Sequence, residues 1–236
     1  MDVIIPLGNG SNWENKELRY CLRSLEKNFL DLGAIYIVGD KPSWARNVKH
    51  INTPDLYFDN KGATIINKVI SACIHEKVSD NFLFTSDDQC FLKPMHAKDV
   101  KPYYTYDLNK KKINYPNKFW KQCMKNTKWT LRKEKLPCFN YETHTPKVFN
   151  KELFVLAMQK YDWVNNLYPT HSLYFNNVVS VPGQIPDDYR IFFDKEGMDI
   201  RLIEGKTFLG YSDLGLSWRL QAKLKELFPK KSRFEQ

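Results

Sequence analysis

Hydrophobic residues in the first ninety positions alternate between short unbroken runs and longer segments with helical spacing. The short runs at 3–7, 35–38 and 82–85 predict buried strands, and a further strand is expected at 48–51. Between them, residues 14–30 and 62–76 place apolar side chains three and four positions apart, which predicts amphipathic helices lying on a sheet. Strands that alternate with helices are typical of an α/β fold with a doubly wound, mainly parallel sheet and helices on both faces.

The second half of the chain has a less regular pattern. Apolar spacing predicts helices at 151–161 and 214–227, and the alternation over 172–181 predicts a further strand. Residues 101–143 are rich in Lys, Tyr and Asn without a clean period, so we expect an irregular insertion over the functional site. At 236 residues, a single domain over 1–236 accommodates all these elements.

Two adjacent carboxylates, Asp87 and Asp88, follow the strand predicted at 82–85. Ligands of parallel sheets bind beyond the carboxyl ends of the strands, so this pair lies at the edge expected for a site. Adjacent carboxylates repel each other unless a cation is present, and Mg²⁺ or Mn²⁺ prefers such oxygens together with phosphate. The alternative is a turn or a helix N-cap, because Ser86-Asp87-Asp88 is also good capping sequence.

The loop at 8–11 follows the first predicted strand and lies at the same edge of the sheet. Its two glycines would let backbone amides approach a phosphate closely, although a plain tight turn explains them equally well. The chain has neither the three-glycine dinucleotide fingerprint nor a G-x-x-x-x-G-K-[ST] phosphate loop. These two classes of nucleotide-binding protein are therefore excluded.

Three further side chains are candidates for phosphate chemistry. Arg19 and Arg23 are four residues apart and share a helix face. They can present planar forks to phosphate, pair with Glu26, or extend into solvent. His144 can act as an acid, a base or a phosphate partner, or it can be structural.

The net charge of +9 indicates an anionic partner: a nucleotide diphosphate, an anionic glycan, a membrane surface or a nucleic acid. Basic residues gather at 110–135 and at 223–233, where they can equally be solvated surface charges. No apolar run is long enough to span a bilayer, and the N-terminus does not resemble a signal peptide. Five cysteines without C-x-x-C spacing favour a reduced, cytoplasmic protein without a zinc site.

Residues 17–28 read E-L-R-Y-C-L-R-S-L-E-K-N, residues 86–88 read S-D-D, and residues 144–146 read H-T-P. These segments together resemble the Stealth family, which includes capsular-polysaccharide hexose-1-phosphate transferases and has a similar E-L-R-Y-S-L-R-S-I-E-K-N helix. Asp87-Asp88 fall on its N-D-D motif, and His144-Thr145-Pro146 looks like its H-x-P-H segment. Residues 1–11 and 212–235 look like the family's first and last blocks.

The resemblance implies a role for each matching residue. Asp2 and Asn9 would lie near the nucleotide, and Asp87 and Asp88 at the metal or donor. Arg19 and Arg23 would face the donor phosphates, and His144 would lie at the reacting phosphate.

The chain also departs from the family pattern. Ser86 stands for the Asn of N-D-D, and Lys147 for the second His of H-x-P-H. Asn60-Lys61-Gly62 before a helix, followed by a strand that ends in carboxylates, also resembles ordinary GT-A glycosyltransferases. The two groups share a nucleotide-sugar fold and differ in which bond breaks.

These observations predict a GT-A-like transferase that uses a nucleotide-sugar donor and Mg²⁺ or Mn²⁺. Residues 1–95 would bind the donor, and residues 96–236 would bind an acceptor hydroxyl, in glycan or polysaccharide biosynthesis. The expected catalytic residues are Arg23, Asp87 and His144, and the expected donor-binding residues are Asp2, Asn9, Arg19, Asn60 and Lys61. Whether a sugar or a sugar phosphate moves stays open. The alternative is a nucleic-acid-binding protein, or a DNA-modifying glycosyltransferase, that uses the basic and aromatic segment 110–135.

Overall fold

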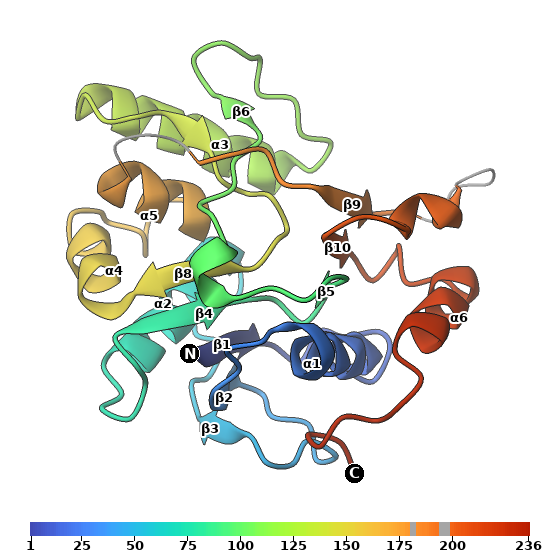
Figure 1. The fold of residues 1–236 in the computed structure, drawn as a ribbon. Helices are drawn as coiled ribbons and strands as arrows, with labels where there is room; N and C mark the ends of the chain where they lie inside the picture. The colour runs from blue at the N-terminus through green and yellow to red at the C-terminus, as the bar shows by residue number, and fades with distance from the viewer. Residues whose placement is uncertain (180–182, 194–198) are drawn as a thin grey trace.

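A five-stranded sheet forms the centre of the computed structural model, which describes residues 1–179, 183–193 and 199–236. The strand order is β3-β2-β1-β4-β8, as Figure 1 shows. Four of these strands are parallel and β8 is antiparallel to β4. Their bounds are β1 Asp2–Leu7, β2 Ile35–Gly39, β3 Lys49–Ile51, β4 Asn81–Phe84 and β8 Lys147–Asn150.

Helices cover both faces of this sheet. On one face, Val3 and Ile5 of β1 pack with Leu22 of α1 (Lys16–Asn28). On the other face, Ile4 packs with Ile66 of α2 (Lys61–Cys73), together with α4 (Lys151–Met158) and α5 (Thr170–Val178). This alternation follows from the period of two in a strand. The predicted α/β class, with a mainly parallel sheet and helices on both faces, is confirmed.

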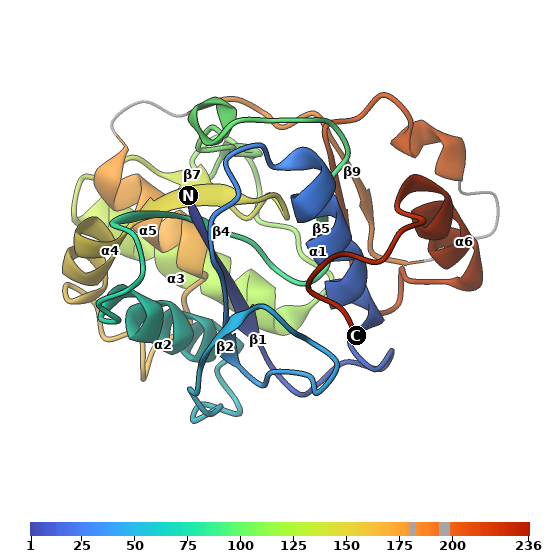
Figure 2. The same cartoon turned by 60° about the horizontal axis from the view of Figure 1, so that its bottom comes forward.

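A second, three-stranded sheet lies beyond α1. Its order is β5-β10-β9, with β5 Gln89–Phe91, β10 Phe208–Tyr211 and β9 Asp188–Ile191. Phe91 and Phe208 pack into the same core as α1, and α6 (Trp218–Leu227) covers the opposite side of this sheet. Short 3-10 turns occur at Ala97–Asp99 and Ile200–Ile203. The last residues then run back along α1, as Figure 2 shows.

Two expectations for the second half were wrong. Residues 101–143 are not irregular throughout, because they contain α3 (Lys118–Lys133) with β6 (Tyr106–Asp107) and β7 (Phe139–Asn140). A buried stripe on α3 is obscured in the sequence by the lysines around it; its members are Cys123, Met124, Thr127, Thr130 and Leu131.

The strand expected over 172–181 is instead the helix α5, and positions 180 and 181 lie outside the described residues. Nearly all of α5 is buried, so its apolar residues follow no helical period. The helices expected near 151–161 and 214–227 are present as α4 and α6.

The structure also bears on the membrane and on the cysteines. Within the described ranges, no helix is both long and apolar enough to cross a bilayer. All five cysteines are buried and free.

Candidate active site

The Asp87-Asp88 turn connects the two sheets, because β4 ends at Phe84 and β5 begins at Gln89. The Gln89 side-chain oxygen accepts hydrogen bonds from Thr85 Oγ1 at 3.1 Å and from the Ser86 N–H at 3.3 Å. From the second sheet, the Tyr211 N–H donates to the Asp88 carbonyl at 3.1 Å. Of the two alternatives for this segment, the turn is present and the helix cap is wrong, because β5, and no helix, follows it.

Negative charge at this turn is poorly compensated. Burial, followed by repulsion from Asp88 and Glu17, raises the pKa of Asp87 well above its ordinary value. Burial also raises the pKa of Asp88 to about 7, although the positive charge of Lys61 opposes the shift. One oxygen each of Asp88 and Glu17 is buried without a hydrogen-bond partner among the described residues. A buried carboxylate without a partner is costly, so the turn fits a cation.

The carboxylates alone do not form a complete metal site. In the described part of the chain, no group of three or more His, Cys, Asp or Glu side chains is arranged to hold a metal ion. Mg²⁺ commonly takes one or two carboxylates and fills its shell with substrate phosphate and water. Asp87 and Asp88 fit that mode of binding.

His144 lies beside the aspartates, on the turn that precedes β8. Its Nδ1 is 3.7 Å from Asp88 Oδ1, and its ring packs at 5.1 Å from the ring of Phe192. Burial, helped by the charges of Arg190 and Lys147, lowers the pKa of His144 to about 4. The structure therefore brings two of the expected residues together, and the imidazole is neutral near pH 7.

Lys147 lies underneath this turn and supports it. Its side chain is fully buried, and Nζ donates to Thr143 Oγ1 at 2.6 Å and to the Thr145 carbonyl at 3.2 Å. Burial lowers the pKa of Lys147 to about 7. At the position where the Stealth pattern has its second histidine, this chain has a lysine that holds the His144 turn in place.

Gly210 of β10 lets the His144 turn lie directly on the second sheet. A Cβ at Gly210 would be 2.8 Å from the His144 carbonyl oxygen, which is too close for the backbone to remain in place. His144 itself has a φ of 52°, so the turn has little freedom to adjust.

We therefore expect Gly210→Ala to displace His144 and lower kcat/KM for the donor by about tenfold, roughly 1.4 kcal/mol of transition-state stabilisation. Steady-state kinetics and a melting curve test this. The control is Gly205→Asn, where a Cβ meets open space and asparagine tolerates the positive φ of 80° better than most side chains do. An alanine variant with wild-type kcat/KM would show that this contact does not position His144.

Glu142 and His171 lie next to the His144 turn, and both were missed from the sequence. Glu142 Oε2 lies 3.2 Å from His171 Nδ1, and Oε1 accepts from the Ser172 N–H at 2.7 Å. Although burial acts in the opposite direction, His171 and this N–H lower the pKa of Glu142 to about 2. The one available signal was that Glu142 is two residues before His144. His171 was not found because its helix was predicted as a strand.

A buried lysine lies at the carboxyl end of β1, close to the loop at 8–11. Lys68 Nζ donates to the Leu7 carbonyl at 2.6 Å and pairs with Asp55. A Cβ at Gly8 would touch the Asp55 carboxylate at 3.2 Å. This charge pair was not predicted, and it fixes the loop in which exposed Asn9 lies.

Asp2 lies at the wrong edge of the sheet for the expected role. It begins β1, whereas the Asp87-Asp88 turn follows the carboxyl end of β4, a parallel neighbour of β1. Its carboxylate accepts from the N–H groups of Ala34 and Ser79, each at 3.0 Å. Asp2 therefore connects loops at the amino edge, an arrangement that does not favour the expected contact with the nucleotide.

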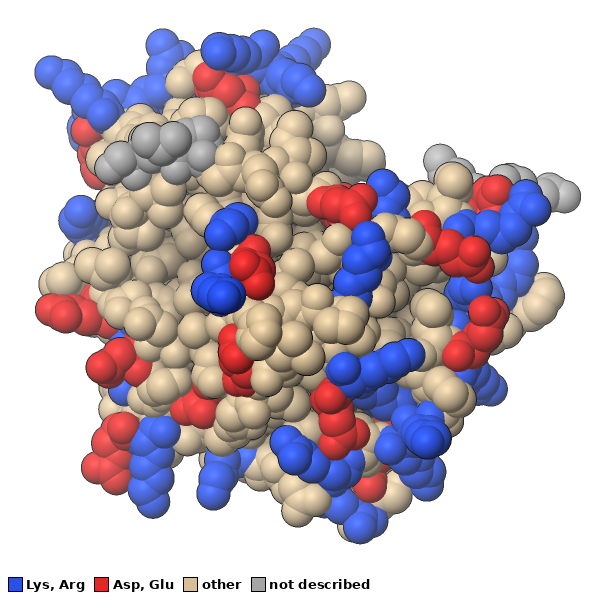
Figure 3. Space-filling view, in the orientation of Figure 1, with Lys and Arg blue, Asp and Glu red and all other residues tan. Residues whose placement is uncertain are grey.

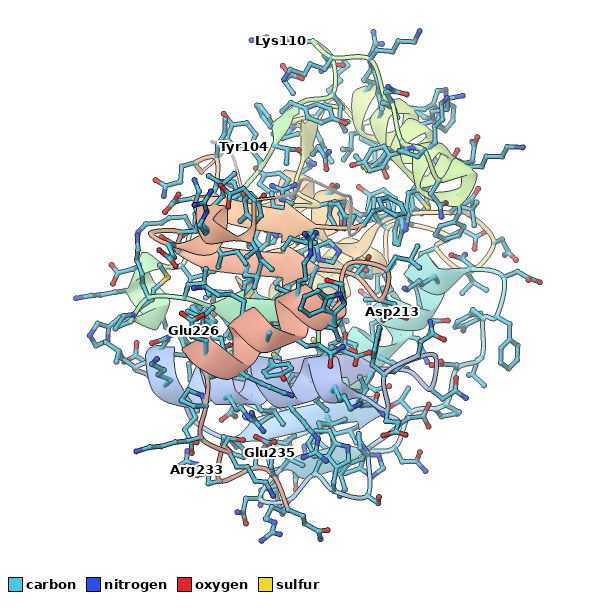
Figure 4. All side chains as sticks on the ribbon, turned by 90° about the vertical axis from the view of Figure 1, so that its right-hand side faces the viewer. Tyr104, Lys110, Asp213, Glu226, Arg233 and Glu235 are labelled. Atoms are coloured by element: carbon cyan, nitrogen blue, oxygen red, sulfur yellow. The ribbon has the colours of Figure 1, made fainter. Side chains whose placement is uncertain are left out.

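Arg19 and Arg23 face the C-terminal segment. Arg23 donates to Glu235 through Nε at 2.8 Å and Nη2 at 2.7 Å, and Arg19 through Nη1 at 3.2 Å. The Arg19 guanidinium also stacks over Trp44, 3.9 Å from the ring centroid. In Figure 4, Glu235 lies below α1 while Asp213, whose charge acts on Asp88, lies above it. Both arginines are occupied by this ion pair, an arrangement that does not favour their expected place at the donor phosphates.

Asn60 and Lys61 lie at the start of α2. The Asn60 side chain caps the helix by accepting from the Ala63 N–H at 3.1 Å, and it donates to three carbonyls of the 163–166 loop. Its polar atoms are therefore occupied by structure. Lys61 is exposed, and its charge acts on Asp87, Asp88 and His144.

Comparison with known proteins gives matches of structure only. No family model matches the chain, so the resemblance to the Stealth family is not confirmed, and no curated protein matches it in sequence. Among solved structures, a galactosyltransferase, LgtC, with donor and acceptor sugar analogues has a TM-score of 0.54 at 11% identity, over 98% of this chain and 96% of that one. An active-site mutant of LgtC has a TM-score of 0.51 at 10% identity, over 96% and 95%. Mouse xyloside xylosyltransferase 1 follows with a TM-score of 0.44 at 11% identity, over 89% and 97%.

The two structures above a TM-score of 0.5 cover nearly the whole chain, and they have the GT-A fold. The chain therefore has the GT-A glycosyltransferase fold.

Proposed function

We propose that this protein transfers a sugar from a nucleotide sugar to an acceptor hydroxyl, with Asp87 and Asp88 holding Mg²⁺ or Mn²⁺. The observation that carries the proposal is the poorly compensated carboxylate pair at the carboxyl edge of the sheet, beside a neutral His144. The GT-A fold supports it, because LgtC with this fold was solved with donor and acceptor sugar analogues. The acceptor would be a glycan or another hydroxyl-bearing polymer.

In this mechanism the chain's own residues bind, orient and move one proton. The divalent cation, when bound, would neutralise charge on the departing diphosphate. Exposed Lys61, at the positive end of the α2 dipole, adds positive charge on the same side. The neutral imidazole of His144 can accept the proton of the acceptor hydroxyl, because its pKa leaves it unprotonated near pH 7. Glu142, fixed by the Ser172 N–H, places a carboxylate beside His171 next to this turn.

Glycosyl transfer is the chemistry that we favour over sugar-phosphate transfer. Attack at phosphorus benefits from guanidinium groups and a protonated imidazole around the phosphoryl oxygens. Here Arg19 and Arg23 pair with Glu235, and His144 is neutral. Attack at C1 of the sugar requires only that the leaving diphosphate be steadied, which the aspartate pair with a cation can do.

The identity of the nucleotide product tests this proposal. We expect a panel of nucleotide sugars incubated with Mn²⁺ to yield a nucleoside diphosphate from at least one donor, detected by mass spectrometry. His144→Ala should slow this release by at least about tenfold, roughly 1.4 kcal/mol of barrier. A nucleoside monophosphate as product would show that a sugar phosphate moves, contrary to the proposal.

A further inference from the structure

The positive charge of this protein is concentrated in one segment. Residues 110–135 contain ten Lys and Arg and a single acid, Glu134, a net charge of +9 that equals that of the whole chain. The rest of the sequence is therefore electrically balanced. Figure 3 shows Lys and Arg gathered at the top of the molecule, over α3 and the loop before it. An anionic partner of this protein is thus attracted mainly to this end.

A small hydrophobic core holds this segment in shape. Met124 and Leu131 on the inner face of α3 pack with Leu108 and Cys138, and the loop residue Ile113 packs against them. Lys128 Nζ donates to the Leu108 carbonyl at 2.6 Å, which ties the helix to the strand region beside it. The basic residues of this segment therefore lie on a packed helix and its adjoining loop.

The outer face of α3 carries a groove of about 460 Å³, here called the α3 groove. Its lining combines four cations with two apolar side chains: Ile113, Lys125, Lys128, Trp129, Arg132 and Lys133. The cations recur at the three- and four-residue spacing that puts them on one helix face. Glu134, the single acidic residue of the segment, does not neutralise these cations, because its carboxylate accepts a hydrogen bond from the Tyr161 hydroxyl at 2.8 Å.

Trp129 gives the α3 groove a flat aromatic surface. Its side chain is 66% exposed, which is unusual for so large an apolar residue. Lys133 Nζ lies 5.3 Å from its ring centroid, so a cation accompanies the exposed ring. A ligand that matches this groove carries regularly spaced negative charge together with a planar ring.

The chemistry of the α3 groove distinguishes among polyanions. A helix that inserts into a membrane surface needs a broad apolar face, whereas Trp129 is the one strongly exposed apolar residue in this lining. A sulfated or carboxylated glycan supplies charge, but its sugar ring offers Trp129 a puckered C–H face and not the flat π face of a base. A nucleic-acid strand supplies phosphates for the cations and bases that stack on tryptophan.

We propose that the α3 groove binds single-stranded nucleic acid through its phosphates and through stacking of a base on Trp129. This inference concerns binding, and it does not depend on the sugar-transfer chemistry proposed above.

Fluorescence anisotropy with a labelled 20-nucleotide oligo-dT and the full chain tests this proposal. We expect binding that weakens with salt, with a slope of log K against log [salt] of about −2 for roughly three phosphate contacts, because Lys128 is held by the Leu108 carbonyl. Lys125→Glu with Arg132→Glu should weaken binding by at least about tenfold. Trp129→Ala should weaken it about tenfold, with a smaller change in the salt slope, because stacking releases no counterion.

The matched control is Lys225→Glu with Lys230→Glu, which makes the same change in net charge on exposed residues elsewhere. This pair should bind the oligonucleotide within about twofold of wild type. Equal weakening in the control would show that only overall charge matters. No binding, or tighter binding at the same salt to anionic phospholipid vesicles or to heparin, would overturn the proposal in favour of no ligand, a membrane or a glycan.

Two further readouts separate the outcomes. Melting curves of all variants report whether the groove substitutions unfold the α3 segment. Release of nucleotide from the donor in the absence of acceptor should be unchanged in every groove variant. A loss of oligonucleotide binding therefore cannot be confused with a failure of the proposed transferase activity.

Discussion

Asp88→Asn is expected to lower donor turnover by at least about a hundredfold, roughly 2.7 kcal/mol of barrier, while leaving the protein folded. The amide keeps the size of the carboxyl group but removes the charge that would hold the cation on the diphosphate. Turnover of a nucleotide sugar with Mn²⁺ measures the first effect, and thermal melting measures the second.

The same substitution is expected to raise the melting temperature at pH 8 in EDTA. The pKa of Asp88 is raised from its ordinary 3.8 to about 7 in the folded state, so its ionisation opposes folding. The free energy of unfolding of the wild type therefore decreases as the pH rises from about 4 to about 7, because Asp88 ionises in the unfolded chain first. Asparagine does not ionise, so the variant does not lose this stability. Mn²⁺ with a nucleoside diphosphate should stabilise the wild type more than the variant.

Asp59→Asn is the control, because it makes the same chemical change on an exposed residue. Turnover and melting temperature should both stay at wild-type values. Full activity of Asp88→Asn, or equal affinity of the wild type for the diphosphate with and without metal, would refute a metal role for Asp88.

Glu235→Ala is expected to destabilise the fold by about 3 kcal/mol, because it leaves two arginines without their buried partner. For a chain of this length that corresponds to a fall of about 6–12 °C in melting temperature. The donor KM should change little, since this ion pair joins α1 to the C-terminal segment. Chemical denaturation and steady-state kinetics measure the two effects separately.

The pH dependence of this effect has a defined sign. Burial opposes ionisation, but bonds from Arg23 and the Ser232 N–H lower the pKa of Glu235 from 4.5 to about 2. A depressed carboxyl pKa gives stability that is present above pH 4.5 and is lost as the pH falls toward 2. The difference between wild type and Glu235→Ala should therefore shrink over that range.

Glu226→Ala serves as the control, because the Glu226 carboxylate also pairs with a cation, Lys223, but its side chain is 67% exposed. Exposed pairs contribute at most about 1 kcal/mol. A large rise in donor KM for Glu235→Ala without loss of stability would restore a donor role to Arg19 and Arg23.

The parts of the fold that were predicted correctly have strong local patterns. β1, β2 and β4 are short apolar runs, and α1 and α2 repeat apolar residues at helical spacing. The second sheet was not predicted, because its three short strands pair only with partners distant in sequence. Helix α5 was predicted as a strand because it is buried on nearly all sides. Its apolar residues therefore do not alternate with polar ones at the helical period that identifies an amphipathic helix.

In the candidate site, likewise, only the residues with a local sequence signal could be predicted. Asp87 and Asp88 could be placed because a strand and a turn directly precede them. The pairing of Arg19 and Arg23 depends on Glu235, more than 200 residues away, and no local pattern predicts it. Glu142 and His171 meet only because α5 packs beside the turn before β8.

The most direct test of the central claim is a thermal-shift titration of the wild-type chain with nucleotide sugars, with and without Mn²⁺. We predict that at least one donor at about a hundredfold above its Kd raises the melting temperature by roughly 5–10 °C in the presence of Mn²⁺. The shift should be lost in the Asp87→Asn, Asp88→Asn double variant. If no nucleotide sugar shifts the melting temperature, or if the double variant shifts as much as the wild type, the proposed donor site is wrong.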